Sequence, residues 1–572
     1  MHRFRAFLLP LSLLLLVGLI VFLRPDRDAA STKTPARPGP REVISTEILS
    51  HPDLAEWTAP QRKRKAPSAQ ELPRLLELAK ERSATMKRLI SAAPQQALEN
   101  AISPASYDAL PEELKPWFER PFAQTATLKV MPVCAPGVSL EPDRLLEMEG
   151  RNWNASVYGW RKGQLSKQDT PLVGITLDGV AAISEGFFQM VPRDEEAYAS
   201  ALPMGNAHPD QDFSTGEPLG GTPVVAVMGG KQYRFSNTAS LEDTNRKLAA
   251  LEISPAPKTG ANVVFAAPAP AADGGIDWAA AMAEVKIQAS VWTESAKDVF
   301  CIRVDFSNRT GAPSSPTELA NLMNGPVASS ILQMSYGKTT VNATVSSTTI
   351  RMPHPTGTYL PSKNTELHAD AIAAYKAVAG ANSLNGYDIV VVHFASIGME
   401  GGGITYAGYA DLVGNRQWLQ GPLFSSVTIH EFGHNYGIGH ASFWQTSNGS
   451  VTGTGTTVEY GDHTDIMGDG PAPEGHFHMQ AKQFLNWFPT ANDNWQDATT
   501  TGSGTRRIYR FDSAETSGVL RGVRVTKASG PSPEYYWLGY RPGLATLPSF
   551  RNGAYVLWQR PGEARSWVID TT

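Results

Sequence analysis

The sequence predicts a multidomain protein in which an α/β (α+β) region lies between a β-rich N-terminal region and a C-terminal β-sandwich-like unit. Two observations lead to this prediction. An apolar strand, a helix and a second apolar strand follow one another between residues 299 and 394. Short β-prone runs separated by turn-forming residues fill 121–250 and recur after Pro489. The 572 residues of the chain are enough for about three or four domains of ordinary size.

The N-terminus begins with the short basic stretch MHRFR, and an uncharged apolar run follows from Ala6 to Leu23. This pattern is typical of a signal anchor or signal peptide over residues 1–23. A small-x-small cleavage site that uses Ala30 would need a small residue two positions earlier, but that residue is Asp28, which favours an uncleaved anchor over a cleaved signal peptide. In both cases we expect an extracytoplasmic protein, membrane-anchored by its N-terminus or secreted, because the basic flank stays inside.

The next segments are assigned from composition and apolar periodicity. Apolar residues recur at helical spacing from Leu72 to Leu89 and stop at about Pro94, which predicts one amphipathic helix. Runs such as 126–133 and 172–177 predict short strands. The resulting order is a Pro/basic linker at 24–67, a helical segment at 68–120, a β-rich N-terminal domain and candidate prodomain at 121–253, and a linker at 254–292.

The region at 293–490 is predicted to be one α/β (α+β) domain. We expect strands at Val299–Phe306 and Tyr387–Phe394, a helix at Glu366–Val378 between them, and a second helix at Leu423–Tyr436. Residues 491–572 are predicted to form a C-terminal β-rich domain. Its expected strands are Arg506–Phe511, Gly518–Val525, Tyr535–Tyr540 and Ala554–Gln559.

Charge and cysteine content exclude several classes of function. The chain has 50 Lys and Arg against 55 Asp and Glu, a net charge of −5, so no global basic field favours nucleic acid as a partner. The two cysteines, Cys134 and Cys301, allow at most one disulfide and cannot build a cysteine-rich zinc site. Any metal must therefore be held by histidines and carboxylates.

The strongest chemical signal is the run HEFGHNYGIGH, from His430 to His440. His430 and His434 are four residues apart on the predicted helix, so both imidazoles project from one face and can chelate one zinc ion. Gly437 permits a backbone turn that most residues resist, and this turn can bring His440 back to the metal. Three neutral histidines leave a fourth position open for water, which is typical of a catalytic zinc site.

Glu431 directly follows the first of these histidines. We expect its carboxylate to take a proton from the zinc-bound water and later pass it to the leaving amine. The metal lowers the pKa of that water and polarises the scissile carbonyl. The predicted reaction is therefore peptide-bond hydrolysis without a covalent intermediate.

HEFGHNYGIGH resembles the HExxHxxGxxH signature of the metzincins, and YGDHTDIMG supplies the downstream methionine that these peptidases require. With QAKQFLNW at 480–487, the pattern is most similar to the gametolysin-like metallopeptidases of family M11, over roughly residues 295–570. The resemblance implies a metzincin-type catalytic domain with one catalytic Zn²⁺, and it leaves a calcium requirement open. The implied site consists of the zinc ligands His430, His434 and His440, the base Glu431 and the turn methionine Met467.

Two further residues are candidates for roles at this site. Some metzincins carry a tyrosine two residues after the turn methionine, but this chain has Asp469 there, so Tyr460 is the candidate oxyanion stabiliser. The alternative for Tyr460 is a packed aromatic residue. Cys134, in VMPVCAPG, is a candidate latency thiol that would occupy the open zinc position. The alternatives for Cys134 are a buried free thiol and a disulfide to Cys301, which lies in a predicted strand.

Other histidines near the motif are weaker candidates. His463, His476 and His478 are alternative ligands or substrate-binding residues, although the spacing of His440 fits the motif better. The alternative is that they are surface residues, or that they contact the metal ligands without binding the metal. His393 ends an apolar strand, and we expect a core residue whose ring is hydrogen-bonded.

These features predict an exported zinc-dependent endopeptidase that acts on extracellular or cell-surface proteins. Residues 401–418 precede the predicted zinc helix, where metzincins have an edge strand that pairs with extended substrate. The alternative for this segment is an ordinary hairpin. The alternative is a surface adhesin or binding protein with a vestigial zinc site. The expected partners are protein or peptide substrates and no nucleic acid. Membrane association is expected if the apolar N-terminal segment is not cleaved.

Overall fold

The computed structural model describes residues 44–569 except 59–66, 132–142, 159–165, 185, 192, 194–195, 230, 252–274, 277–291, 312–313, 361–362, 398–403, 405, 470–474, 489–493, 514–517, 530–533, 544–552 and 561–564. The chain divides into two compact units, Met1–Ser45 and Thr46–Thr572. The first is described only at residues 44 and 45, so the elements below belong to the second. No helix in the described ranges is long and apolar enough to cross a membrane. The predicted anchor at 1–23 and the candidate thiol Cys134 lie outside these ranges.

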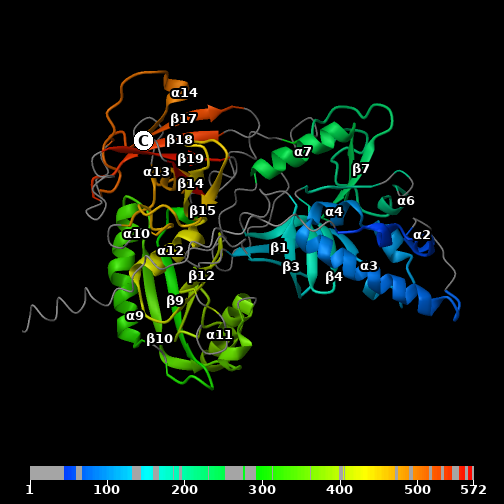
Figure 1. The fold of residues 1–572 in the computed structure, drawn as a ribbon, viewed down its shortest axis with the longest axis horizontal. Helices are drawn as coiled ribbons and strands as arrows, with labels where there is room; N and C mark the ends of the chain where they lie inside the picture. The colour runs from blue at the N-terminus through cyan, green and yellow to red at the C-terminus, as the bar shows by residue number, and fades with distance from the viewer. Residues whose placement is uncertain are drawn as a thin grey trace, which may run out of the picture. The chain divides into compact units, whose positions relative to one another are not determined.

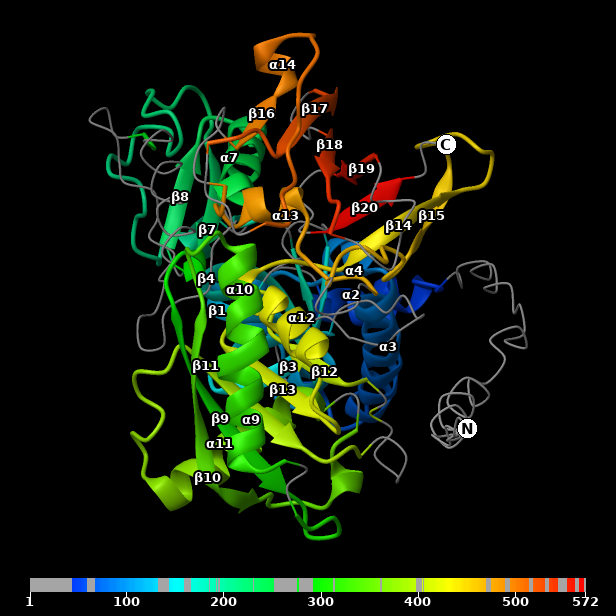
Figure 2. The same cartoon turned by 90° about the vertical axis from the view of Figure 1, so that its left-hand side faces the viewer.

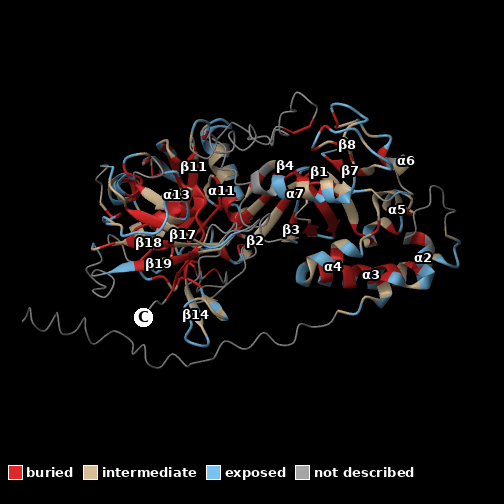
Figure 3. Ribbon diagram, turned by 90° about the horizontal axis from the view of Figure 1, so that it is seen from above, coloured by how far each residue is buried: buried red, intermediate tan, exposed pale blue. Residues whose placement is uncertain are grey.

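A cluster of helices around α3 (Leu72–Ala92) opens the described chain. Leu75 and Leu78 of α3 pack with Leu54 and Trp57 of α2 in one apolar cluster, and Figure 3 shows the buried and exposed sides of α3. Because the helix ends just before Pro94, the predicted amphipathic helix is confirmed. The other elements of the cluster are η2 (Glu47–Ser50), α2 (Pro52–Thr58), α4 (Pro94–Glu99), α5 (Pro104–Asp108) and η3 (Lys115–Trp117).

The next region is β-rich, as its short apolar runs predict. Five strands close into a barrel in the order β1-β2-β3-β5-β4, and the core of this barrel includes Leu128, Leu146 and Leu172. A three-stranded sheet, β6-β7-β8, follows it and is succeeded by α7 (Thr238–Leu251). The strands and the remaining helix are β1 (Arg120–Met131), β2 (Asp143–Met148), β3 (Arg151–Val157), β4 (Lys167–Leu177), β5 (Val180–Ile183), β6 (Gln189–Met190), α6 (Glu196–Ala199), β7 (Val224–Met228) and β8 (Lys231–Phe235).

A five-stranded sheet in the order β10-β9-β11-β13-β12 forms the centre of the third region. The pairs β10/β9, β9/β11 and β11/β13 are parallel, whereas β12 pairs antiparallel with β13 and lies at the end of the sheet order. The strands are β9 (Lys297–Asp305), β10 (Val341–Arg351), β11 (Ile389–Phe394), β12 (Gly408–Ala410) and β13 (Arg416–Gln420). Both predicted strands are thus confirmed, as β9 and β11.

Helices cover both faces of this sheet because β9 and β11 are apolar on both sides. Val299 and Cys301 of β9 pack in one cluster with α9 (Pro316–Leu322), the π-helical turn η5 (Met323–Val327), α10 (Ala328–Met334) and α12 (Ser425–Tyr436). Phe300 and Ile302 point to the other cluster, which contains Leu367 of α11 (Asn364–Ala379). Figure 2 shows α10 and α12 in front of the sheet. The arrangement is compatible with an α+β peptidase domain.

The C-terminal strands join one seven-stranded sheet in the order β15-β14-β20-β19-β18-β17-β16, and Figure 1 shows β17, β18 and β19 side by side. The prediction of a β-sandwich-like unit is therefore wrong for the described residues. The apolar face of this sheet packs on Met479 and Phe488, so no second sheet is needed to bury it. The elements are β14 (Ala441–Thr446), β15 (Gly455–Val458), α13 (Met479–Phe484), β16 (Trp495–Asp497), α14 (Ala498–Thr501), β17 (Gly522–Ala528), β18 (Glu534–Tyr540), β19 (Ala554–Gln559) and β20 (Ser566–Ile569).

The strand predicted at Arg506–Phe511 is also absent, because this segment has an irregular backbone. Among the described residues, its backbone hydrogen bonds include one from Tyr509 N–H to Leu520 O, just before β17, and one from Phe511 N–H to Tyr540 O of β18. Phe511 is nevertheless fully buried. The segment has the apolar content of a strand without a continuous ladder of hydrogen bonds.

Candidate active site

Helix α12 presents three of the predicted site residues, His430, Glu431 and His434, on a buried segment. Apolar residues of the same helix, among them Ile429 and Phe432, pack into the core beside the five-stranded sheet. This packing fixes the rotation of the helix about its axis. The spacing of four residues then places the His430 and His434 rings together, with centroids 4.7 Å apart.

The turn that was predicted at Gly437 is present. Gly437 caps α12 with φ 105° and ψ 16°, in the left-handed region that glycine adopts without steric cost. The Ile438 N–H donates to Gly433 O at 2.9 Å, which reverses the direction of the chain. The reversal brings the His440 ring to centroid distances of 5.4 Å from His430 and 4.9 Å from His434.

Each of the three imidazoles uses Nδ1 to contact an acceptor. His430 Nδ1 lies 2.8 Å from Ile466 O, and His434 Nδ1 lies 2.8 Å from Ile438 O. His440 Nδ1 lies 2.5 Å from the Oε1 atom of Glu459. Because carbonyl and carboxylate oxygens only accept, these contacts place the proton of each neutral ring on Nδ1 and the lone pair on Nε2.

The residues present fit a metal ion. One ligand atom from each histidine lies within 4.8 Å of the others, and among the described residues this is the one such group. Burial lowers the pKa of His430 to about 4, and burial together with the neighbouring imidazole lowers the pKa of His434 and of His440 well below the usual value. Neutral imidazoles are the form that binds Zn²⁺, and a three-histidine set is typical of a catalytic zinc centre.

Met467 lies directly below the helix that carries the histidines. Its sulfur approaches Gly433 so closely that a Cβ atom at that position would overlap it. The Met467 N–H donates to Asp465 Oδ1 at 2.8 Å, and Met467 O accepts from the Ala441 N–H at 3.0 Å. The side chain is 1% exposed. Met467 thus packs against the helix that carries His430 and His434, and its role as a turn methionine stays a prediction.

A buried polar cluster supports this turn from the far side. His478 Nε2 lies 2.5 Å from Asp462 Oδ2, and His478 Nδ1 lies 2.6 Å from the Tyr555 hydroxyl of β19. Burial opposes the charge on His478, but Asp462 and Asp465 outweigh it and raise the pKa of His478 above its usual value. His478 thus links the methionine turn to the C-terminal sheet and lies outside the histidine cluster.

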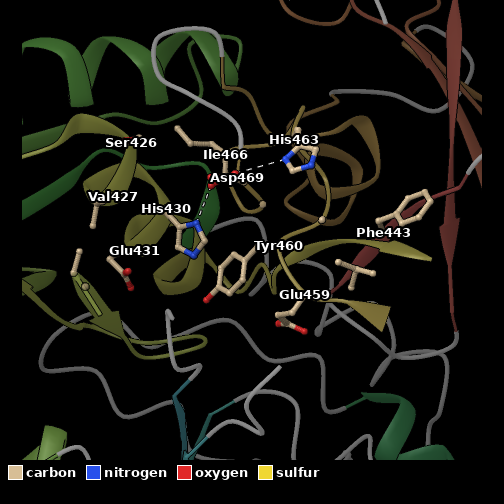
Figure 4. Close-up of a pocket in the computed structure, with 15 residues that line it drawn as sticks. Ser426, Val427, His430, Glu431, Phe443, Glu459, Tyr460, His463, Ile466 and Asp469 are labelled. Atoms are coloured by element: carbon tan, nitrogen blue, oxygen red, sulfur yellow. Dashed lines mark hydrogen bonds and ion pairs between the residues drawn. The ribbon is translucent and has the colours of Figure 1, made fainter. Parts of the chain in front are cut away.

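Glu431 lines a cavity of about 480 Å³ next to His430. Gly408 of the edge strand β12 lines the same cavity, and a Cβ atom there would collide with the Glu431 carboxylate. Figure 4 shows Glu431 and Tyr460 on either side of the His430 ring. Apolar side chains of Val427 and Phe443 contribute to the lining. The cavity is therefore lined by the Glu431 carboxylate, the His430 imidazole and the apolar side chains of Val427 and Phe443.

Tyr460 directs its hydroxyl at the histidine cluster. Its Oη lies 3.0 Å from His440 Nε2, and the two ring centroids are 4.2 Å apart. The backbone of Tyr460 has φ 58°, in the left-handed region that residues other than glycine rarely adopt. The side chain is 9% exposed, so the ring is packed and its hydroxyl also faces the cluster.

The remaining candidates lie apart from the cluster of His430, His434 and His440. His463 and Asp469 are at the cavity rim, 3.6 Å apart, with side chains that are 65% and 73% exposed. His476 is buried, and its ring centroid lies 5.7 Å from that of Phe511. His393 is a fully buried core residue whose ring nitrogens lie 3.0 Å from Ser314 Oγ and 3.1 Å from Leu419 O.

Cys301 carries a free, fully buried thiol within β9, and burial raises its pKa far above the usual value. The disulfide to Cys134 that the sequence left open involves a residue outside the described ranges. Cys134 itself lies outside the described residues.

Sequence reasoning did not identify Glu459 or Gly408. Glu459 directly follows β15, and no motif or periodicity distinguishes this acid from a surface residue. Only the pairing of β14 with β15 places it beside His440. The role of Gly408 could not be predicted for the same reason, because it depends on the position of β12 beside α12, which brings Gly408 next to Glu431.

Residues 317–525 match the family model of the gametolysin peptidase M11. The matched range includes α12, His440 and Met467. No curated protein matches the chain. This match is consistent with a gametolysin-like metallopeptidase region at 317–525, as the motifs imply.

Proposed function

We propose that this protein is an exported zinc-dependent endopeptidase that cleaves extended segments of extracellular or cell-surface proteins. The family match supports a peptidase. The observation that carries the finer proposal is the convergence of three buried imidazoles next to the Glu431 carboxylate. His430, His434 and His440 would hold the ion through Nε2.

A bound zinc ion would act as a Lewis acid that makes a water molecule more acidic and polarises the substrate carbonyl. Glu431 accepts a proton from the attacking water and delivers it to the leaving amine. The Tyr460 hydroxyl donates a hydrogen bond to the carbonyl oxygen as negative charge develops on it. The left-handed backbone of Tyr460 supports this role, because strained backbone conformations concentrate at functional sites.

The position of β12 supports an extended substrate. This strand ends the order of the five-stranded sheet, and its Gly408 lines the cavity beside Glu431. A peptide added alongside β12 would place its scissile bond near the carboxylate. The apolar side chains of Val427 and Phe443 favour an apolar substrate residue in the cavity.

Export is proposed from the basic and apolar N-terminal pattern at residues 1–23, which would anchor the protein in a membrane or be removed on secretion.

The β-rich region at 121–253 is proposed as a prodomain. Its Val130 O accepts from the Leu412 N–H at 2.9 Å, and its Ser166 N–H donates to Leu412 O at 2.5 Å, two residues beyond β12. Mass spectrometry of the active secreted form tests this proposal. A new N-terminus within 254–292 supports it, and an intact N-terminus contradicts it.

The activity itself is tested with the Glu431→Gln variant. Wild-type protein and variant are supplied with zinc and incubated with casein. We expect cleavage by the wild type and a loss of about 10²- to 10⁴-fold in the variant, which keeps its zinc because Glu431 is not a ligand. Glu366→Gln, at an exposed glutamate in the first turn of α11, is the matched control and should cleave normally. A folded, zinc-loaded wild type that cleaves nothing on a broad substrate panel would favour the vestigial adhesin instead.

A further inference from the structure

Three residues from distant parts of the sequence meet at one end of the seven-stranded sheet. His440 directly precedes β14, Glu459 directly follows β15, and Arg565 directly precedes β20. β14 pairs antiparallel with β15 and parallel with β20. These directions bring the start of β14, the end of β15 and the start of β20 to the same end of the sheet.

The three side chains form a continuous chain of contacts at this end. His440 Nδ1 lies 2.5 Å from Glu459 Oε1, and Arg565 Nη1 lies 3.1 Å from Glu459 Oε2. The side chains of His440 and Glu459 are each 3% exposed, and that of Arg565 is 22% exposed. Each oxygen of the buried carboxylate therefore has one specific partner.

This chain of contacts distinguishes His440 from the other two imidazoles. His430 and His434 direct Nδ1 to the backbone carbonyls of Ile466 and Ile438, which belong to segments next to the helix. His440 relies on a side chain, which has rotational freedom unless something holds it. Arg565 supplies the second contact that fixes the Glu459 carboxylate in place.

We propose that Glu459 and Arg565 are positioning residues for the metal centre: Glu459 fixes the His440 imidazole with Nε2 toward the ion, and Arg565 fixes Glu459. This inference rests on the proposed function, because it requires an ion at the three histidines. Acidic partners of this kind orient metal-ligating histidines and increase their basicity. Arg565 lies beyond the range 317–525 of the family match, so the C-terminal strand contributes to a site that the matched region does not complete alone.

A purely structural ion pair is the alternative, and metal affinity separates the two. We would measure Zn²⁺ affinity by competition with a chromogenic chelator, using the full chain and the variants Glu459→Ala, Glu459→Gln, Arg565→Gln and Glu459→Ala/Arg565→Gln. Glu534→Gln is the matched control, because Glu534 is a carboxylate of the same sheet that accepts from the Trp558 indole and lies outside this chain of contacts. Thermal unfolding in chelator reports the stability of each apoprotein separately.

We expect Glu459→Ala to lower zinc affinity by about 10- to 100-fold and Arg565→Gln to lower it by a smaller factor. The double variant should bind zinc like Glu459→Ala alone, because Arg565 acts through Glu459. The isosteric Glu459→Gln preserves the shape of the side chain and should lie between wild type and Glu459→Ala, which keeps the test valid if the alanine variant unfolds. The visible spectrum of the Co²⁺-loaded protein should change in the Glu459 variants and stay unchanged in Glu534→Gln.

Zinc affinity and a cobalt spectrum that are unchanged in the folded Glu459 variants would overturn this inference and leave the proposed function standing. Additive losses in the double variant would show that Arg565 does not act through Glu459, and would overturn its role. A folded wild-type protein that binds no zinc would contradict the proposed function itself, and the positioning roles with it.

Discussion

The histidine cluster is built from two halves that differ in how the chain supports them. In the helical half, His430 and His434 project from α12 and are oriented by backbone carbonyls. In the sheet half, His440 lies at the start of β14 and is oriented by the side chains of Glu459 and Arg565. The helical half is thus held by groups that no single substitution removes, whereas the sheet half depends on residues that one substitution can delete.

The largest expected effect comes from removing a ligand of the helical half. His434→Ala should abolish stoichiometric zinc binding and proteolysis. It should also remove the stability that zinc confers, about 2.7 kcal/mol when free zinc is 100 times the Kd of the wild type. Chemical unfolding with and without zinc measures this difference. Chelated wild type is the control, since it isolates the cost of the buried substitution, and a zinc-dependent shift retained by the variant would contradict the ligand assignment.

A substitution between His430 and His434 tests how far this half depends on its contact with Met467. Gly433→Val should destabilise the fold by about 1–3 kcal/mol, because its side chain would overlap the Met467 sulfur. Urea unfolding of the apoprotein measures the change in free energy. Combining it with Met467→Ala should recover part of the loss, and a fully additive double variant would argue against contact between the two residues.

The junction between the halves is Gly437. A Cβ atom there meets only ordinary van der Waals neighbours, so Gly437→Ala acts through backbone strain at φ 105°. We expect a loss of about 1–2 kcal/mol in unfolding free energy, with a parallel loss of zinc affinity as His440 is displaced. Gly449→Ala, at another left-handed glycine that lies in the connection between β14 and β15, should lose stability without losing affinity. Unchanged stability in Gly437→Ala would contradict the observed turn.

The smallest expected effect is a pH dependence on the sheet side. The pKa of His478 is raised and that of Asp462 is lowered, in both cases against the effect of burial. The stability contributed by this pair is therefore fully present above the unfolded pKa of aspartate and below that of histidine, and is lost as pH rises through the folded pKa of His478.

The unfolding free energy of wild type relative to His478→Gln should accordingly be larger at about pH 5.5 than at about pH 8.5, by an amount on the order of 1 kcal/mol. Urea unfolding of both proteins at the two pH values measures it. A difference that grows with rising pH would show that His478 is neutral in the fold.

The helical half could be predicted from sequence because its determinants are local. Residue spacing on one helix places His430 and His434 together, and the conformational freedom of Gly437 indicates the turn. The strands β9 and β11 could be predicted equally well, because continuous apolar runs are typical of strands that are buried on both faces.

The sheet half could not be predicted because its contacts join segments that are distant in sequence. Nothing local to β20 indicates that it pairs with β14, so Arg565 resembled any other surface arginine. The same reason explains the incorrect sandwich prediction. Short alternating runs predict strands but do not specify whether their apolar face meets a second sheet or, as here, the segment around Met479 and Phe488.

The most direct test of the account is anomalous diffraction at the zinc absorption edge from crystals of the zinc-loaded protein. We predict one peak at about 2.0–2.1 Å from the Nε2 atoms of His430, His434 and His440, with Glu431 beside it and not bound to it. No peak at this position, or a peak on a different set of residues, would contradict the central claim that the two halves join to hold one catalytic metal ion.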